Sequence, residues 1–338
     1  MACGTCSPWR RCELEKLLQI EGLKVEFKVY EGLLKVLNGV ELALEEGERV
    51  GLVGEAGCGK TTTMKCVLRI LPSPPGRITA GRILFRGQDL LRLPLQRMQR
   101  VRGRGIAMIF QDPTAALNPV FTIGDQLMAV IRHGSRDAMN KKEIRRRAIA
   151  VLREVQLPDP ERILANYPIQ LSGGMRQRVC IAMALSTEPE LLIADEPTTS
   201  LDVTIQDQIL RLLNALVERR GTSVIFITHS LGVVREMADR VYVMYAGSIV
   251  ESAPKGELFS RPLHPYTQGL MRAVPKLTGG GIAEGIPGRI PDYLNPPPGC
   301  RFQPRCPHAW ERCSQAPPPL KEVEDGRQVA CFLYEEGA

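Results

Sequence analysis

A glycine-rich loop between an apolar strand and a helix constrains this chain more than any other feature. The run ERVGLVG at 48–54 is typical of a buried strand, and GEAGCGKT at 54–61 follows with the spacing G-x-x-x-x-G-K-[ST]. The glycines let backbone N–H groups curl around a phosphate, and the N-terminus of a helix starting at Lys60 adds partial positive charge. Lys60 would reach β- and γ-phosphate oxygens, and the Thr61 hydroxyl would bind Mg²⁺. The pattern predicts a phosphate-binding site.

Short apolar runs alternate with helical patterns over much of the chain. Within 203–219, Ile209, Leu212, Leu213 and Leu216 recur at helical spacing and predict a core-facing stripe. Strands that alternate with helices indicate an α/β fold with a mainly parallel sheet covered on both faces. The further strand candidates are RILFRG (82–87), IAMIFQ (106–111), LLIADE (191–196), SVIFIT (223–228) and RVYVMYAG (240–247).

Two further motifs lie where a strand or a helix meets a turn. LLIADEPT at 191–198 brings Asp195 and Glu196 to the C-terminal end of a strand. One carboxylate there can hold Mg²⁺, and its neighbour can polarise an attacking water. In LSGGMRQR, Ser172 is typical of a helix N-cap, and Gly173 and Gly174 permit close approach to an anion. A solvated strand end and a plain helix start are the simpler alternatives, and the presence of the phosphate loop disfavours the first of them.

Composition excludes several classes of protein. With 44% hydrophobic and 24% charged residues among 338, the chain is typical of a soluble globular protein of about two domains. No window approaches the ~18 consecutive apolar residues of a membrane span, and the N-terminus lacks the apolar core of a secretory signal. We therefore expect a cytosolic chain that works on a membrane only from its surface or through a partner. The net charge of +7 permits contact with nucleic acid or anionic lipid but demonstrates neither.

Changes of pattern along the chain predict its domain organisation. Residues 1–20 show no clear periodicity and are expected to form an N-terminal tail. The alternation breaks near residue 112, where basic segments such as KKEIRRRAIAVLREVQL (141–157) predict a helical subdomain over about 112–190. After residue 255 proline and glycine become frequent, which predicts a loop-rich module over 256–338.

The order of the motifs resembles that of the ATPase subunit of an ABC transporter over residues 21–255. Gln111 after a strand, LSGGMRQR, LLIADEP, SLD (200–202) and His229 after SVIFIT follow the phosphate loop in that order. The resemblance implies ATP and Mg²⁺ as ligands, with Thr61, Gln111 and Asp195 around the metal. It also implies the catalytic set Glu196, as general base, with His229 at the γ-phosphate and Gln111. The implied phosphate cradle is Gly54, Glu55, Ala56, Gly57, Cys58, Gly59, Lys60, Thr61 and Thr62.

The resemblance further implies that each ATP site is shared by two ATPase subunits. Ser172, Gly173 and Gly174 would close on the γ-phosphate of ATP held by the partner subunit, and Asp202 of the SLD motif is also expected among the nucleotide-binding residues. An aromatic side chain about 24 residues before the phosphate loop is expected to stack on adenine. Tyr30 is the first choice and Phe27 the second, although both are also compatible with a core position.

The segment SRPLHPYTQGLMRAV (260–274), followed by IPG (286–288), resembles the C-terminal region of dipeptide and oligopeptide importer ATPases. That subfamily also includes importers of nickel and of oligosaccharides. The resemblance implies a second ATPase subunit, either a paralogue or a second copy, two transmembrane permease subunits and an extracellular solute-binding protein. It places the chain peripherally on the cytoplasmic side of the cell membrane. A soluble ABC ATPase acting on nucleic acid is the rival class, but neither a long coiled-coil insert nor a second cassette is present, so no nucleic acid is expected.

Four of the ten cysteines, Cys300, Cys306, Cys313 and Cys331, are spaced C-x5-C-x6-C-x17-C within this module. Four thiolates suit tetrahedral zinc or a [4Fe–4S] cluster, and buried free thiols remain the plainer alternative. The resemblance favours the [4Fe–4S] cluster, because some dipeptide-importer ATPases carry one here. Such a cluster is expected to lie far from the phosphates. Cys3, Cys6 and Cys12 make an incomplete ligand set and favour a disordered tail.

Overall fold

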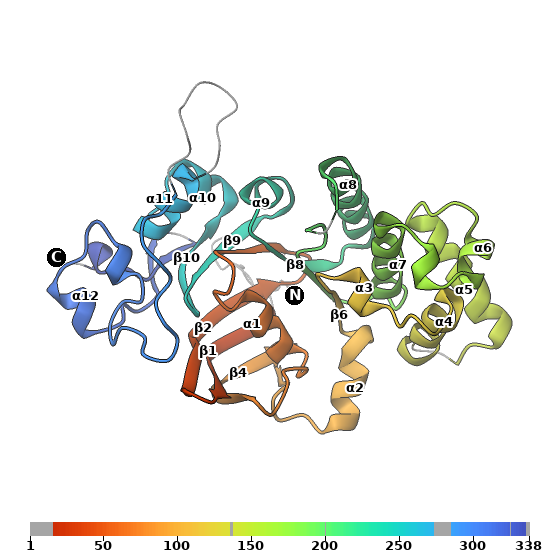
Figure 1. The fold of residues 1–338 in the computed structure, drawn as a ribbon, viewed down its shortest axis with the longest axis horizontal. Helices are drawn as coiled ribbons and strands as arrows, with labels where there is room; N and C mark the ends of the chain where they lie inside the picture. The colour runs from red at the N-terminus through yellow and green to blue at the C-terminus, as the bar shows by residue number, and fades with distance from the viewer. Residues whose placement is uncertain (1–15, 136–137, 200, 274–284, 325, 336–338) are drawn as a thin grey trace, which may run out of the picture.

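The computed structural model describes residues 16–135, 138–199, 201–273, 285–324 and 326–335. Two β-sheets occupy the middle, with a helical region at one end and a loop-rich module at the other (Figure 1). Cys3, Cys6 and Cys12 lie outside the described residues, as does Ser200 of the SLD motif.

The predicted tail boundary at residue 20 is wrong, because the first strand, β1, already begins at Lys16 and runs to Val29. Leu17 and Leu18 are both buried, since the pairing of β1 with its neighbour is irregular between Lys16 and Leu18. Such a bulge puts two adjacent side chains in the core and hides the two-residue period of a strand.

The larger sheet has eight strands within the described residues, and its parallel part carries the phosphate loop. Five neighbouring strands, β9, β3, β8, β7 and β6, run parallel as predicted, whereas β10, β12 and β11 pair antiparallel at one edge. The α/β fold class is thereby confirmed. In sheet order the strands are β11 (Lys321–Glu324), β12 (Arg327–Val329), β10 (Ser248–Pro254), β9 (Arg240–Tyr245), β3 (Arg49–Val53), β8 (Ser223–Thr228), β7 (Leu191–Asp195) and β6 (Ile106–Ile109).

A separate antiparallel sheet is built from strands that precede and follow β3 in the chain. The candidate strand at 82–87 belongs to it rather than to the parallel sheet, because it pairs directly with β1. A short turn joins β1 to β2, and two neighbouring strands joined by a tight turn run antiparallel. In order this sheet contains β2 (Gly32–Glu45), β1 (Lys16–Val29), β4 (Gly76–Phe85) and β5 (Gln88–Asp89).

Alternate residues of the parallel strands face two different cores. Leu191 and Ile193 pack with α1 (Lys60–Val67) and the antiparallel sheet, whereas Leu192 and Ala194 pack with α7 (Gly173–Leu185). The helices α1 and α7 therefore cover opposite faces of one sheet. The second core also contains α8 (Val203–Arg220), on which all four residues of the predicted stripe are buried.

The segment at 112–190 contains helices, and its described residues (112–135 and 138–190) contain no strand. Here α4 begins with a capping box formed by Thr122 and Asp125, and α5 begins with one formed by Asn140 and Glu143. The predicted helix at 141–157 corresponds to α5. The helices up to β7, in chain order, are α2 (Leu95–Arg104), α3 (Pro113–Ala116), α4 (Ile123–Gly134), α5 (Lys141–Glu154), α6 (Pro160–Ala165), a 3-10 turn (Pro168–Gln170) and α7.

The C-terminal module surrounds a third core beside β9 and β10. Tyr266, Phe302 and Tyr245 pack there in tilted and edge-to-face arrangements, with ring centroids 4.6–5.5 Å apart. His264 caps the helix that carries Tyr266, since its Nδ1 accepts from the Tyr266 N–H at 3.0 Å. Burial lowers the pKa of His264 to about 3, so the ring is neutral. The remaining helices are α9 (Leu231–Met237), α10 (Lys255–Ser260), α11 (Pro265–Arg272), α12 (Glu311–Gln315) and two 3-10 turns (Gln303–Arg305 and Phe332–Tyr334).

Candidate active site

The phosphate loop leaves the end of β3 through a glycine that no other residue could replace without a clash. Gly54 has φ +153°, and a Cβ there would lie 2.1 Å from the Met244 carbonyl oxygen. Gly59, at φ +107°, precedes α1, and a Cβ there would lie 2.6 Å from Leu37. Bare backbone at these two positions lets the loop curl so tightly that its N–H groups can approach an anion.

Lys60 is the buried cation at the centre of this loop. Its Nζ donates to the Gly54 carbonyl at 2.7 Å and to the Glu55 carbonyl at 3.1 Å, although the residue is only 5% exposed. The ammonium group is therefore held inside the curl of the loop, where the oxygens of a bound phosphate would meet it. The sequence prediction for Lys60 is compatible with this position.

Cys58 fills space behind the loop. The residue is 1% exposed, and burial raises the pKa of its thiol even though Lys60 lies beside it. Its carbonyl accepts from the Gly247 N–H at 2.8 Å, which joins the loop to the turn between β9 and β10. The side chain is thus a packing element within the cradle.

Thr61 and Asp195 form the oxygen-rich corner where Mg²⁺ is expected. The Thr61 hydroxyl donates to Asp195 Oδ1 at 3.0 Å, across the gap between α1 and the end of β7. Burial raises the pKa of Asp195, and the hydrogen bond from Thr61 opposes that shift. Hydroxyl and carboxylate oxygens are the donors that Mg²⁺ prefers, so the residues present fit this ion.

Glu196 lies at the meeting point of three neighbouring parallel strands. Because β6, β7 and β8 are adjacent, the residues that follow them meet at one edge of the sheet. The Gln111 amide donates to Glu196 Oε2 at 3.0 Å, and His229 Nδ1 lies 3.3 Å from Oε1. The structure thus brings together all three residues that the sequence predicts to be catalytic.

A third side-chain contact to Glu196 was not predicted. The Thr199 hydroxyl donates to Glu196 Oε2 at 3.0 Å. Glu196 itself has φ +44°, an uncommon backbone conformation for a residue with a side chain. The only signal in the sequence is a hydroxyl three residues after the acid, and many turns share that feature. Together these constraints hold the carboxylate in one position.

The predicted partner-facing residues lie apart from the phosphate loop of their own chain. Ser172 caps α7 by accepting from the Met175 N–H at 3.3 Å, and Gly173 and Gly174 form the first turn. Asp202 precedes α8, next to Leu201, which lies against Gly173. Since α1 and α7 cover opposite faces of the sheet, this arrangement is compatible with a site completed by another subunit (Figure 1).

The two candidates for adenine stacking occupy different environments. Tyr30 lies in the turn between β1 and β2 and its side chain is fully exposed. Phe27 is partly buried against the core that contains α1. An exposed ring is free to stack on a base, so Tyr30 stays the prediction and Phe27 has the structural role.

The four C-terminal cysteines line one small cavity in the module. Burial raises the pKa of Cys300 and of Cys331 to about 11. Hydrogen bonding from the backbone of Phe302, His308 and Leu333 lowers the pKa of Cys300, Cys306 and Cys331, respectively, and so opposes the effect of burial. Within the described residues, however, no three His, Cys, Asp or Glu side chains are arranged to hold a metal ion.

The fold and the site define a P-loop ATPase in which a phosphate-binding loop faces a base at a strand end. Residues 37–199 match the family model described as ABC transporter, and residues 250–313 match that described as oligopeptide/dipeptide transporter, C-terminal region. The chain is 28% identical to the dimeric ATP-binding cassette MJ0796 solved in a post-hydrolysis state with ADP and Pi, with a TM-score of 0.63 over 70% of this chain and 98% of that one.

Curated relatives extend the similarity over nearly the whole chain. The dipeptide transport ATP-binding protein DppD of Bacillus subtilis is 46% identical, covering 96% of this chain and 97% of its own. A probable peptide ABC transporter ATP-binding protein of Sinorhizobium fredii is 48% identical over 95% of this chain and 96% of its own. The chain therefore belongs to the ABC transporter ATP-binding subunits of the oligopeptide/dipeptide type, and it is an ATPase. No helix in the described parts is long and apolar enough to cross a bilayer.

Proposed function

We propose that this chain drives import of dipeptides or oligopeptides by hydrolysing ATP at sites that it shares with a second ATPase subunit. The observation that carries this proposal is the complete arrangement around Glu196, joined in one chain to a C-terminal region of the oligopeptide/dipeptide type. The relatives bearing that region are named for dipeptide and oligopeptide transport. Two membrane permeases and an extracellular solute-binding protein would complete the assembly, with this chain on the cytoplasmic side.

Each residue has a distinct task in hydrolysis. The loop N–H groups and Lys60 bind the phosphates, and Mg²⁺ at Thr61, Asp195 and Gln111 would neutralise their charge. Glu196, held by Gln111 and Thr199, orients the attacking water and accepts its proton. His229 is exposed beside Glu196 and can reach a γ-phosphate from there. Gln111 touches the base and precedes the helical region, so it can report the state of the site to a permease.

The membrane assignment is tested by capturing the tagged chain from solubilised membranes. An importer subunit should bring down polytopic membrane proteins, and their identity will separate peptide transport from nickel or oligosaccharide transport. Recovery of DNA or ribosomes in their place would contradict the proposal and support the nucleic-acid class.

The C-terminal cavity is proposed to hold a [4Fe–4S] cluster bound by Cys300, Cys306, Cys313 and Cys331. Support comes from four thiols on one cavity and from backbone N–H groups beside three of the sulfurs, although the thiols would have to converge further to bind a metal. Such N–H groups are among the features that set the potential of iron–sulfur clusters. When bound, the cluster would supply either a structural crosslink or a redox-sensitive group.

Metal analysis of anaerobically purified protein tests this assignment. We expect about four irons and four sulfides per chain, as a [4Fe–4S] cluster requires, with absorbance near ~400 nm. A Cys306→Ser variant should lose them, whereas Cys180→Ser, which changes a buried cysteine of the helical region, should retain them. One zinc per chain, or no metal at all, would contradict the cluster and leave the ATPase assignment intact.

A further inference from the structure

The C-terminal module contacts the phosphate loop directly. Arg305, next to Cys306, forms a two-pronged ion pair with Glu55 of the loop, with Nη1–Oε2 at 2.8 Å and Nη2–Oε1 at 3.1 Å. The Arg305 side chain is only 3% exposed. A planar guanidinium paired in this way fixes both the distance and the orientation of its carboxylate.

Arg305 is itself held firmly by the module. Its Nε donates to the Pro287 carbonyl at 3.0 Å, and Nη2 donates to the Ile286 carbonyl at 3.0 Å. Nη1 also lies 3.3 Å from the Tyr245 hydroxyl. The side chain therefore has little freedom to move unless the backbone beside Cys306 moves with it.

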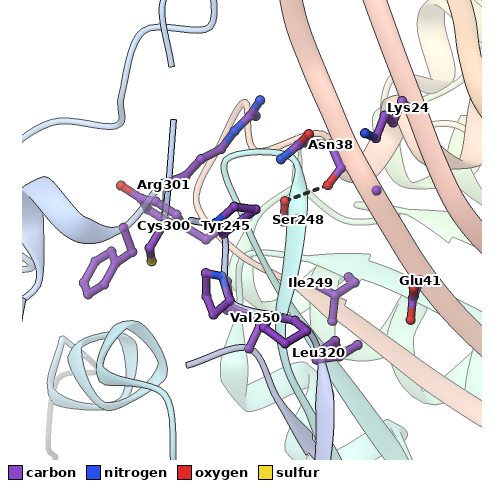
Figure 2. A pocket seen from close by; sticks show the side chains of 17 residues that line it. Lys24, Asn38, Glu41, Tyr245, Ser248, Ile249, Val250, Cys300, Arg301 and Leu320 are labelled. Atoms are coloured by element: carbon purple, nitrogen blue, oxygen red, sulfur yellow. Dashed lines mark hydrogen bonds between the residues drawn. The ribbon is translucent and has the colours of Figure 1, made fainter. Parts of the chain in front are cut away.

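A second arginine gives a parallel route from the cysteine cavity. Arg301, next to Cys300, donates to the Ala246 carbonyl, and the following residue, Gly247, donates its N–H to the Cys58 carbonyl of the loop at 2.8 Å. Figure 2 shows Arg301 extending from Cys300 past Tyr245 toward the turn between β9 and β10, on the wall of a cavity of about 430 Å³. A Cβ on Gly247 would lie 2.0 Å from the Val36 carbonyl, so this turn is tightly packed.

Two tyrosines of the same module complete the support. The Glu55 N–H donates to the Tyr266 hydroxyl at 2.9 Å, and the Tyr293 hydroxyl donates to the Gly57 carbonyl at 2.9 Å. The backbone of the phosphate loop is thus bonded to the module on both sides of its tip. Neither tyrosine nor either arginine is needed to explain the chemistry at Glu196.

We propose that Arg305 and Arg301 are positioning residues that couple the four-cysteine cavity to the phosphate loop, so that the state of the four thiols sets the affinity for ATP. Each arginine adjoins a cysteine of the cavity in the chain and reaches the loop either directly or through the single peptide group between Ala246 and Gly247. A group bound by the thiols would fix the backbone at residues 300–306, and its loss would release both arginines together. The identity of that group rests on the proposed function, whereas the coupling rests on the contacts alone.

The first test separates nucleotide binding from chemistry. Arg305→Gln should raise the KM for ATP by about 5–150-fold, the usual range of coupling between sites, with kcat little changed because Arg305 lies outside the reacting groups. Arg305→Lys keeps the positive charge but loses the planar guanidinium, so its KM for ATP should lie between that of the natural chain and that of Arg305→Gln. Arg312→Gln is the matched control, since the exposed Arg312 lies in the same module, pairs with Glu335 and packs over Phe332.

The second test uses the reciprocity of coupled sites. N-ethylmaleimide modification is followed by mass spectrometry at Cys300, Cys306, Cys313 and Cys331, and the signal of Cys58 is read separately. A saturating non-hydrolysable ATP analogue should slow modification of the four cysteines about 5–150-fold in the natural chain, and this protection should vanish in Arg305→Gln. The Glu55→Gln variant breaks the same pair from the loop side and should also lose the protection, which guards against a folding defect in one variant.

Either of two results would overturn the coupling. One is equal protection of the four cysteines in the natural chain and in both variants, or no protection in any of them. The other is a rise in KM that Arg312→Gln reproduces, since this would indicate general loosening of the module. A finding of no iron would remove the cluster without touching this proposal, because the alkylation experiment needs no metal.

Discussion

Replacing Glu196 by glutamine should abolish steady-state ATP hydrolysis while leaving ATP bound. Loss of a positioned general base lowers rates by about 10²–10⁴-fold, and glutamine cannot accept the proton of the attacking water. The amide keeps the size of the side chain and can still bond with Thr199, so the site should remain folded. Because hydrolysis is the step that would loosen the dimer, the variant should accumulate as an ATP-bound dimer. Phosphate release measures the first effect, and size-exclusion chromatography with ATP measures the second.

Glu218→Gln provides the matched control for this experiment. Glu218 is an exposed glutamate on α8 that pairs with Arg49, far along the helix from the site, and exposed ion pairs contribute little. Its hydrolysis rate should therefore match that of the natural chain. Normal steady-state hydrolysis by Glu196→Gln would contradict the role of Glu196 as the base.

Two inactive variants should restore each other if each ATP site is shared between chains. Lys60→Ala removes the loop cation, and Gly173→Asp places a negative charge where the γ-phosphate of the partner's ATP is expected. Aspartate is well tolerated in the first turn of a helix, so α7 should still form. A mixed dimer then contains one intact site, formed by the unaltered loop of one chain and the unaltered α7 of the other.

The expected gain follows from random pairing in a two-fold dimer. Half of the dimers in an equal mixture are mixed and hold one intact site of two, so activity should reach about a quarter of that of the natural chain. The chain that carries both substitutions, mixed with either single variant, forms the control, because no dimer in that mixture contains an intact site. Activity of the first mixture no greater than that of the separate variants, in a preparation shown to be dimeric, would contradict the shared site.

Local pattern sufficed to predict the phosphate loop and the acidic strand end. The loop needs glycines within eight consecutive residues, and Asp195 and Glu196 directly follow a run of apolar residues, so both signals are contained in short segments. The prediction that Gln111, Glu196 and His229 act together came from the family resemblance. The structure explains their proximity, because β6, β7 and β8 are neighbours in the sheet.

Contacts between distant segments could not be predicted in this way. Glu55 and Arg305 are 250 residues apart, and nothing in either neighbourhood indicates the pair. The start of β1 was missed because a bulge disrupts its alternation, and the antiparallel sheet depends on pairing between strands rather than on composition. The partner-facing role of residues 172–174 and the stacking role of Tyr30 stay predictions, since they involve molecules other than this chain.

The burial of Cys58 has a consequence for how the enzyme tolerates its surroundings. Oxidants and alkylating agents attack the thiolate, and this thiol is both shielded from solvent and held protonated by its raised pKa. An accessible cysteine inside the nucleotide cradle would be oxidised early under oxidative stress, and ATP binding would then be lost. Here the cradle should stay chemically inert under conditions that modify accessible sulfur elsewhere in the cell.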